Sequence, residues 1–412
     1  MKQIKLLTIF AICTIILLTN ENFAQPATSV LTGGLTSPNK IITAGQTSLL
    51  VSENGTMMPN NGRISMINKT TGARQTLIGG LPSGINTAEG MPAPSGPSGL
   101  KLKGLTLYVT IGQGDSVVPG GRGGLAANGS PVTPLNNSVL ELSLPADYEQ
   151  LASGFTLSFA DQTTLAGGGQ VNLLNAQGKM LGVRLVANLP DWKREHNPNI
   201  PQYNVRAANV FGVEAVGGDL YIVDASFNQL YKVNTATGKY ETFTVFASKP
   251  NPLPFGPPFA EAVPDSIHLY GNRLLVTYLT GFPFAAGLAE VRSIDLADGS
   301  QTTFADGLTT AIDVLPVPVA GNYDVFYILE FSANFLGQPP APGRLKLFQT
   351  NSSNDPGTTQ TVTLLDNIVS PVSMARDNET GDLFITQIFP GLVRKVSATV
   401  DQSTQISNGQ EK

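Results

Sequence analysis

The 412-residue sequence combines 43 glycines and 29 prolines with 41% hydrophobic residues, which indicates many tight turns around a globular core and excludes a disordered chain. A formal net charge of −5 and a charged fraction of only 13% make nucleic acids and anionic membranes poor partners. The single cysteine, Cys13, lies in the first 24 residues, so the rest of the chain has no disulfide framework and no thiolate metal site.

The first 24 residues have the pattern of a secretory signal peptide. Lys2 and Lys5 precede an uncharged, mostly apolar run at 6–18, and the sequence turns polar before Ala24. The run is too short to span a bilayer, although a membrane anchor is the alternative interpretation. We therefore expect cleavage near Ala24, export to the periplasm or the extracellular space, and no stable membrane insertion.

A unit of four short strands is clearest at 211–247. Runs of β-branched and aromatic residues at 211–215, 220–224, 229–234 and 242–246 are separated by short turn sequences such as Gly217-Gly218 and Thr237-Gly238. A four-stranded meander of this size is typical of one propeller blade. Because both of its faces are apolar, it must stack on copies of itself.

The chain supplies six such units. Innermost strands are expected at 39–43, 98–102, 211–215, 265–269, 310–314 and 372–376. Second strands follow at 49–53, 107–111, 220–224, 274–278, 326–330 and 383–387. Third strands follow at 62–68, 138–144, 229–234, 289–295, 343–349 and 391–397. Fourth strands follow at 74–81, 183–189, 242–247, 302–308 and 362–368.

The sixth outer strand comes from the other end of the chain, because residues 29–35 repeat the pattern of 75–81. The sequence therefore predicts an all-β protein: a six-bladed β-propeller of four-stranded antiparallel blades over residues 25–398. The N-terminal strand, at 28–34, closes the ring and removes two exposed sheet edges. We expect a monomer with a disordered tail at 399–412.

One blade carries an insertion at about 145–181, between its third and fourth strands. We interpret it as an added hairpin of strands at 155–159 and 170–174 that the fold does not require, with a seventh blade as the alternative.

The loops predict two unequal faces. Turns on one face are short, whereas the other face, here called the long-loop face, carries long Gly/Pro-rich loops. These loops are at 79–96, 112–137, 190–209, 248–263, 279–288 and 331–342. Function usually lies on loops held by a rigid scaffold, so a site is expected on the long-loop face.

Acidic side chains mark the strand ends at this face. Glu53, Asp224 and Glu330 end second strands, and Asp265 begins an inner strand. If these carboxylates converge at the channel mouth, they can hold Ca²⁺ or Mg²⁺, which prefer oxygen ligands. The alternative is a structural role for Asp224, whose carboxylate can accept hydrogen bonds from its own turn, and likewise for Glu53 and Glu330.

A second polar column runs along the inner strands. Lys101, Glu214, His268 and Asp313 occupy equivalent positions in four consecutive blades, beside a wholly apolar column. Ionisable groups there are expected to line the axial channel, either as part of a ligand site or simply paired with one another and with water.

Aromatic and proline-rich segments at 250–259 and 281–284 place rings near the channel mouth. Phe282, with Tyr278 at the preceding strand end, is a candidate contact for an apolar ligand, and loop packing is the alternative. With Asp265, His268, Glu214 and Asp313, these two residues make up the candidate ligand-binding set.

The order of segments resembles the ScyD/ScyE family of exported, NHL-like propeller proteins. The resemblance is carried by SPNKIITAGQTSLLVSENG, GPSGLKLKGLTLYVTIGQGDS, FGVEAVGGDLYIVDASFNQLYKV, EAVPDSIHLYGNRLLVTYLTGFPF and SPVSMARDNETGDLFIT, and it covers nearly the whole chain after the signal peptide. The sequence departs from the pattern at Tyr278, where the family has an acid, and in the 145–181 insertion. The resemblance implies a secreted propeller and supplies no catalytic motif.

Three functions remain open from the sequence. The first is an exported module that binds a small molecule or a protein through the long-loop face. The second is a divalent-metal-dependent hydrolase or lactonase, by likeness of architecture to gluconolactonase-type propellers, and the third is a structural surface or assembly protein.

Overall fold

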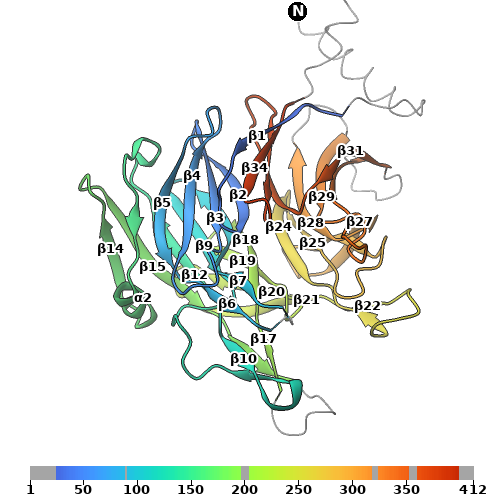
Figure 1. Cartoon of the computed structure of the whole chain (residues 1–412), viewed down its shortest axis with the longest axis horizontal. Helices are drawn as coiled ribbons and strands as arrows, with labels where there is room; N and C mark the ends of the chain where they lie inside the picture. The colour runs from blue at the N-terminus through green and yellow to red at the C-terminus, as the bar shows by residue number, and fades with distance from the viewer. Residues whose placement is uncertain (1–24, 89–90, 196–203, 318–322, 352–359, 399–412) are drawn as a thin grey trace, which may run out of the picture.

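The computed structural model describes residues 25–88, 91–195, 204–317, 323–351 and 360–398, and it forms a six-bladed β-propeller (Figure 1). The expected signal peptide and C-terminal tail lie outside the described residues. Blade 1 contains β2 (Pro38–Ala44), β3 (Ser48–Glu53), β4 (Gly62–Asn68) and β5 (Arg74–Leu81). Blade 2 contains β8 (Pro97–Lys103), β9 (Thr106–Ile111), β12 (Ser138–Ser143) and β15 (Met180–Asn188).

The other four blades repeat the same order. Blade 3 contains β18 (Val210–Val216), β19 (Asp219–Asp224), β20 (Gln229–Asn234) and β21 (Tyr240–Val245). Blade 4 contains β24 (Pro264–Tyr270), β25 (Arg273–Tyr278), β26 (Ala289–Asp295) and β27 (Gln301–Leu308). Blade 5 contains β28 (Ala311–Val317), β29 (Tyr323–Glu330), β30 (Gly343–Asn351) and β31 (Gln360–Ile368). Blade 6 contains β32 (Pro371–Arg376), β33 (Leu383–Gln387), β34 (Leu392–Val396) and the N-terminal β1 (Thr28–Thr32).

The predicted ring closure is confirmed. β1 pairs antiparallel with β34, with Thr28 opposite Val396, and Figure 1 shows the blue first strand beside the red last one. An apolar cluster that includes Ile41 of β2 and Phe384 of β33 fills the space between blades 6 and 1. The last sheet is therefore built from both ends of the described chain.

Neighbouring blades are also joined by a repeated hydroxyl bridge. Each inner strand has an irregular register near its start, which leaves backbone groups unpaired within the blade. In four blades a hydroxyl on the second strand donates to an inner-strand carbonyl of the next blade. These bonds are Ser52 to Ser98 at 2.6 Å, Thr110 to Phe211 at 2.5 Å, Thr277 to Ile312 at 3.3 Å and Thr386 to Asn39 at 2.7 Å. The hydroxyls thus tie the bulged inner strands to one another around the axis.

The 145–181 insertion differs from the expected hairpin. Residues 155–159 do not form one strand: β13 (Phe155–Thr156) pairs in parallel with β5 of blade 1, and α2 (Phe159–Ala166) follows it. The expected strand at 170–174 exists as β14 (Gln170–Leu174), but it pairs with β15 and becomes a fifth strand of blade 2. In Figure 1 these elements lie at the left of the propeller.

The insertion is also part of the core and not an appendage. Tyr148, Phe155, Leu157 and Leu165 are buried in the same apolar cluster as Leu77 of β5. A short 3₁₀ turn, η2 (Tyr148–Gln150), starts this segment, and a second one, η1 (Gly121–Gly123), lies in a loop of blade 2.

The long-loop face has two halves. Over blades 1 to 3, three small hairpins pack together: β6 (Gly84–Asn86) with β7 (Ala93–Ser95), β10 (Val117–Pro119) with β11 (Leu125–Ala127), and β16 (Trp192–Arg194) with β17 (Val205–Ala207). Over blades 4 to 6 the loops contain one two-residue hairpin, β22 (Lys249–Pro250) with β23 (Phe259–Ala260), and many aromatic rings. The labelled strands β10, β17 and β22 lie at the bottom of Figure 1. Within the described residues, no helix is long and apolar enough to cross a membrane.

Candidate functional site

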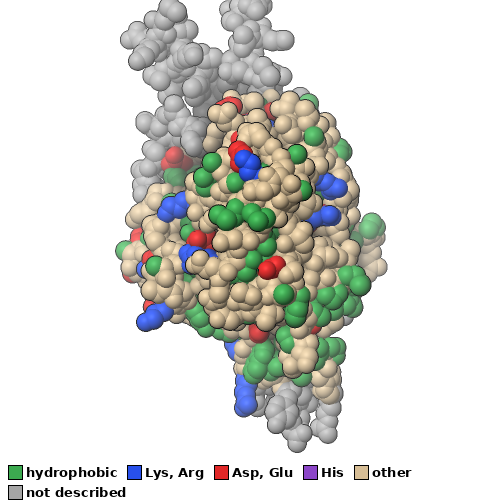
Figure 2. Space-filling model, turned by 90° about the vertical axis from the view of Figure 1, so that its left-hand side faces the viewer, with side chains coloured by type: hydrophobic (Ala, Val, Ile, Leu, Met, Phe, Trp, Pro, Cys, Tyr) green, Lys and Arg blue, Asp and Glu red, His purple; other side chains and the backbone are tan. Residues whose placement is uncertain are grey.

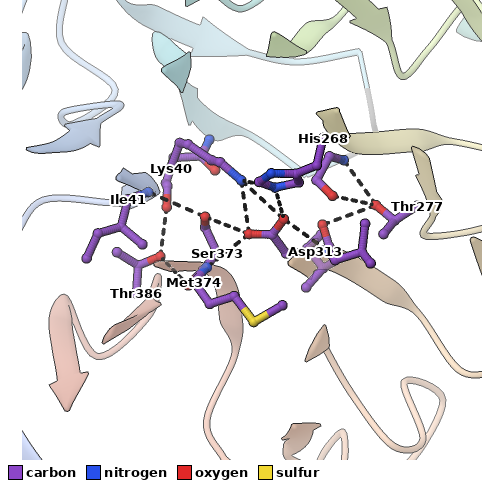
Figure 3. A network of polar contacts seen from close by, with 12 residues as sticks. Lys40, Ile41, His268, Thr277, Asp313, Ser373, Met374 and Thr386 are labelled. Atoms are coloured by element: carbon purple, nitrogen blue, oxygen red, sulfur yellow. Dashed lines mark hydrogen bonds and ion pairs between the residues drawn. The ribbon is translucent and has the colours of Figure 1, made fainter. Parts of the chain in front are cut away.

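The axial channel holds a network that joins four blades (Figure 3). Lys40 of blade 1 reaches Asp313 of blade 5, with its Nζ 3.1 Å from Oδ1 and 3.0 Å from Oδ2. His268 of blade 4 places its Nε2 3.0 Å from Asp313 Oδ1 and 3.3 Å from Lys40 Nζ. From blade 6, the hydroxyl of Ser373 and the backbone N–H of Met374 donate to Asp313 Oδ2 at 2.9 and 3.0 Å.

Asp313 is the centre of this network and is fully buried. Burial opposes its ionisation, but the Lys40 ammonium and the hydrogen bond with His268 outweigh burial and hold the pKa of the Asp313 carboxyl below its ordinary value. Burial and the Lys40 charge lower the pKa of His268, which is therefore neutral at pH 7. Asp313 is therefore an ionised carboxylate whose charge is balanced by Lys40 and whose oxygens already accept hydrogen bonds. This arrangement is typical of a buried ion pair and not of a general base.

The other channel residues form a second pair and one isolated acid. Glu214 Oε1 lies 2.5 Å from Lys101 Nζ, and Glu214 Oε2 accepts from the backbone N–H of Leu269 at 3.2 Å. Asp265 is buried near Lys40 and Asp313. Burial raises the pKa of Asp265 well above its ordinary value, and the Asp313 carboxylate adds to the rise.

Lys101, Glu214 and His268 do occupy equivalent positions, but Asp313 does not: it lies opposite Leu329, at the position of Ser373, and Leu315 takes the place expected for it. The four side chains meet in two separate pairs, and the lysine at the centre of the network, Lys40, was missed. A signal for Lys40 exists in the sequence. By strand register the same inner-strand position carries small residues in four other blades, namely Gly99, Gly212, Ser266 and Ser373, and carries Asp313 itself in blade 5. A lysine at such a position reaches across the axis, where the other blades leave room for it.

The strand-end acids do not gather at the channel mouth. Glu53 accepts from the backbone N–H of Thr36 at 2.5 Å and from the hydroxyl of Ser65, and it pairs with Arg63 at 3.1 Å. Glu330 accepts from the backbone N–H of Thr309 at 2.7 Å and pairs with Arg344 at 2.7 Å. Each acid thus binds the chain segment that enters its own blade.

Asp224 has the structural role that was the alternative interpretation. Its Oδ1 accepts three backbone N–H bonds, from Asn209, Ser226 and Phe227, at 2.9–3.1 Å. Its Oδ2 is buried without a hydrogen-bond partner. Burial raises the pKa of Asp224 to about 6, against the effect of the three N–H donors.

A divalent ion does not fit this arrangement. The expected set of Glu53, Asp224, Asp265 and Glu330 is not brought together, because three of the acids are bound within three different blades and Asp265 lies on the channel wall. Across the part of the chain that the structure describes, no three acid, histidine or cysteine side chains are placed to hold a metal ion.

A continuous row of phenylalanine rings crosses the long-loop face of blades 4 to 6. We call it the aromatic row. Successive ring centroids are 6.3, 6.4, 4.4, 5.8 and 6.4 Å apart along Phe255, Phe282, Phe284, Phe335, Phe331 and Phe389. Phe255 and Phe282 are about half exposed, and Phe389 is 78% exposed. The row joins the two predicted Phe/Pro segments to Phe331 and Phe335 of the 331–342 loop and to Phe389 of blade 6, three rings that the sequence reasoning did not single out.

Tyr278 is not part of this surface. Its side chain is buried and packs edge-on against Phe246, with ring centroids 5.3 Å apart. Of the two aromatic residues proposed to contact a ligand, only Phe282 is exposed.

The fold makes this chain a six-bladed β-propeller module. No model of a known protein family matches the chain, and no curated protein matches it. Solved structures similar to it include an auxiliary nutrient binding protein from Bacteroides thetaiotaomicron, with 10% identity and a TM-score of 0.48 over 92% of this chain and 78% of that chain.

Two further solved structures are also similar to the chain. The PQQ-bound aldose sugar dehydrogenase from Streptomyces coelicolor has 12% identity and a TM-score of 0.44, over 91% of this chain and 99% of that chain. A nidogen/laminin complex has 9% identity and a TM-score of 0.42, over 83% of this chain and 86% of that chain.

Proposed function

We propose that this chain is an exported propeller that binds an uncharged, apolar ligand at the aromatic row on its long-loop face. The observation that carries the proposal is the continuity of six rings across loops of blades 4 to 6, with three of them at least about half exposed. The resemblance to the ScyD/ScyE family supports the export and the non-catalytic role in this proposal.

The row has the properties of a pre-formed apolar surface. Edge-to-face and tilted contacts between neighbouring rings hold each ring in place before a ligand arrives. Proline and glycine residues surround the rings, and none of the residues at 251–259 or 281–285 is charged. An exposed apolar surface of this kind is costly in a soluble protein unless it contacts a partner.

The metal-dependent hydrolase receives no support from the geometry, because the acids proposed as ligands are separately bound by backbone N–H groups and arginines. The channel network does not favour catalysis either, because Asp313 is already saturated with donors.

The test uses the neutral dye Nile red, whose fluorescence rises in an apolar environment. Titrating the dye into protein comprising residues 25–398 is expected to give a saturable increase. The double variant Phe282→Ser, Phe389→Ser removes two exposed rings and is expected to weaken the dye's affinity by about tenfold or more.

Phe159→Ser is the matched control, because Phe159 is also exposed but lies on α2, which packs on β14 and β15 of blade 2, whereas the aromatic row lies over blades 4 to 6. This control is expected to bind the dye as the wild type does. Equal losses in both variants, or no saturable binding by the wild type, would contradict the proposed site.

A further inference from the structure

The insertion builds a hollow on the side of blade 2 that faces blade 3. The hollow has a volume of about 460 Å³, and its floor is formed by β12, β15 and the added strand β14. Cross-strand register places Glu141, Arg184 and Gln170 in one row, and Ser143, Gly182 and Asn172 in the next. Figure 2 shows the left-hand side of Figure 1, where the insertion lies, and this surface is mostly uncharged, with a few charges of both signs among hydrophobic side chains.

The hollow exists because blade 2 is wider than its neighbour. The inner part of the same sheet face is apolar and packs on blade 3, through Tyr108, Val139 and Val186. Blade 3 has only four strands and leaves the fifth strand of blade 2 uncovered, so Gln170 and Asn172 are exposed. Gly182 deepens the floor because it has no side chain.

The charges of the hollow are already neutralised and fixed. Arg184 Nε donates to Glu141 Oε1 at 2.9 Å, and its Nη2 contacts both Glu141 Oε2 and the carbonyl of Thr235 in blade 3, the latter at 3.1 Å. A second charged group would have to compete with this ion pair, so the site favours a neutral ligand. Within the described residues, the amide groups of Gln170 and Asn172 have no hydrogen-bond partner in the protein, and each offers both a donor and an acceptor.

We propose that this hollow is a binding site for a neutral oligosaccharide. Sugar hydroxyls also donate and accept, which matches the two free amides and the Ser143 hydroxyl, while Leu144, Pro145 and Met180 line the hollow with apolar surface for the C–H faces of a sugar ring. The site is independent of the aromatic row, because its lining residues lie on β12, β14 and β15 of blade 2 and at the start of the insertion, whereas the row lies over blades 4 to 6.

The test measures binding of cellotriose, maltotriose and triacetylchitotriose to protein comprising residues 25–398 by isothermal titration calorimetry. At least one of the three is expected to bind. Gly182→Leu fills the floor, Asn172→Ala removes one amide, and each is expected to weaken that binding by about tenfold or more.

Gly182→Ala is the matched control, because a methyl group there meets its nearest neighbours at an ordinary 3.5 Å and leaves most of the hollow open. It is expected to retain binding, as is the double variant Phe282→Ser, Phe389→Ser. The proposal is overturned if none of the three sugars binds the wild type, or if binding persists unchanged in both Gly182→Leu and Asn172→Ala. It is equally overturned if the aromatic-row variant loses the sugar, which would place the sugar at the other site. Since the aromatic row is tested with Nile red, failure of either proposal leaves the other standing.

Discussion

Single carboxylates at the ends of the second strands hold the blade entrances together. Glu53 and Glu330 each combine a backbone N–H donor with an arginine of the next strand, so their charge is balanced locally. Asp224 has three N–H donors on one oxygen and none on the other. Asp224 therefore has a carboxylate oxygen without a donor, whereas both oxygens of Glu53 and of Glu330 have polar partners.

The pKa of Asp224 predicts a specific pH dependence. The folded-state pKa is about 6 and the ordinary value is 3.8, so between these values the folded state holds a proton that the unfolded state has lost. Stability from this group is therefore present below about pH 4 and is lost as the pH rises through 6. The loss amounts to roughly 3 kcal/mol, because one pKa unit corresponds to about 1.4 kcal/mol.

The measurement compares the melting temperature of the wild type with that of Asp224→Asn between pH 4 and pH 7.5. The amide keeps an acceptor for the N–H donors but does not titrate, so the wild type should lose stability relative to the variant as the pH rises. A difference between the two proteins that stays constant over this range would show that Asp224 does not titrate there.

At this scale the sequence identified the ionisable residues better than it identified their partners. Glu53, Asp224, Glu330 and the four-residue channel column were all recognised as polar positions in apolar strands. Their side-chain directions depend on register irregularities at the start of each inner strand, which a strand pattern does not contain. The role of Lys40 was not predicted, because its long side chain makes its contacts in another blade, far from its own position on the strand.

The inner strands of neighbouring blades are joined by close contacts between their backbones as well as by apolar side-chain packing. Gly99 of β8 lies so near the next blade that a Cβ atom there would be 2.3 Å from the Phe211 carbonyl oxygen. That carbonyl also accepts the Thr110 hydroxyl, so it cannot move without breaking the bridge between blades 2 and 3.

Gly99→Ala is therefore expected to destabilise the fold by about 1–3 kcal/mol, because the added methyl group meets backbone that is held in place. Urea unfolding followed by far-ultraviolet circular dichroism measures this loss. Gly218→Ala is the control, since a Cβ at Gly218 has no neighbour within 4 Å, and its unfolding midpoint should match the wild type. An unchanged midpoint for Gly99→Ala would mean that the inner strands can separate freely.

The repeated strands were predictable because each blade shows the same alternation of apolar and polar residues and the same turn residues, and because the four-strand unit recurs six times. The insertion was not, because FTLSF alternates like a strand although Ser158 starts a helix. Ser158 Oγ accepts from the Asp161 N–H at 3.2 Å, and the Asp161 carboxylate accepts from the Ser158 N–H at 2.8 Å. This reciprocal capping signal was present in the sequence and outweighs the alternation, with Leu165 buried against the sheet.

The whole molecule depends on the strand that completes blade 6. Deleting residues 26–34 removes β1 and exposes the edge of β34, so the melting temperature should fall by several degrees and aggregation should increase. Light scattering during a thermal ramp measures both effects. Val30→Thr is the control, because Val30 is more than half exposed and the substitution keeps the backbone pairing. A truncated protein that melts as the wild type does would show that the ring is stable without β1.

The pairing of β1 with β34 also sets an order of events during synthesis. The ribosome makes β1 before any blade, whereas β34 is the last strand of the described chain. While the five intervening blades emerge, the nascent chain is an open arc with unpaired edges, which chaperones and proteases can recognise. The circle becomes complete in one late step, after both end strands have reached the same compartment.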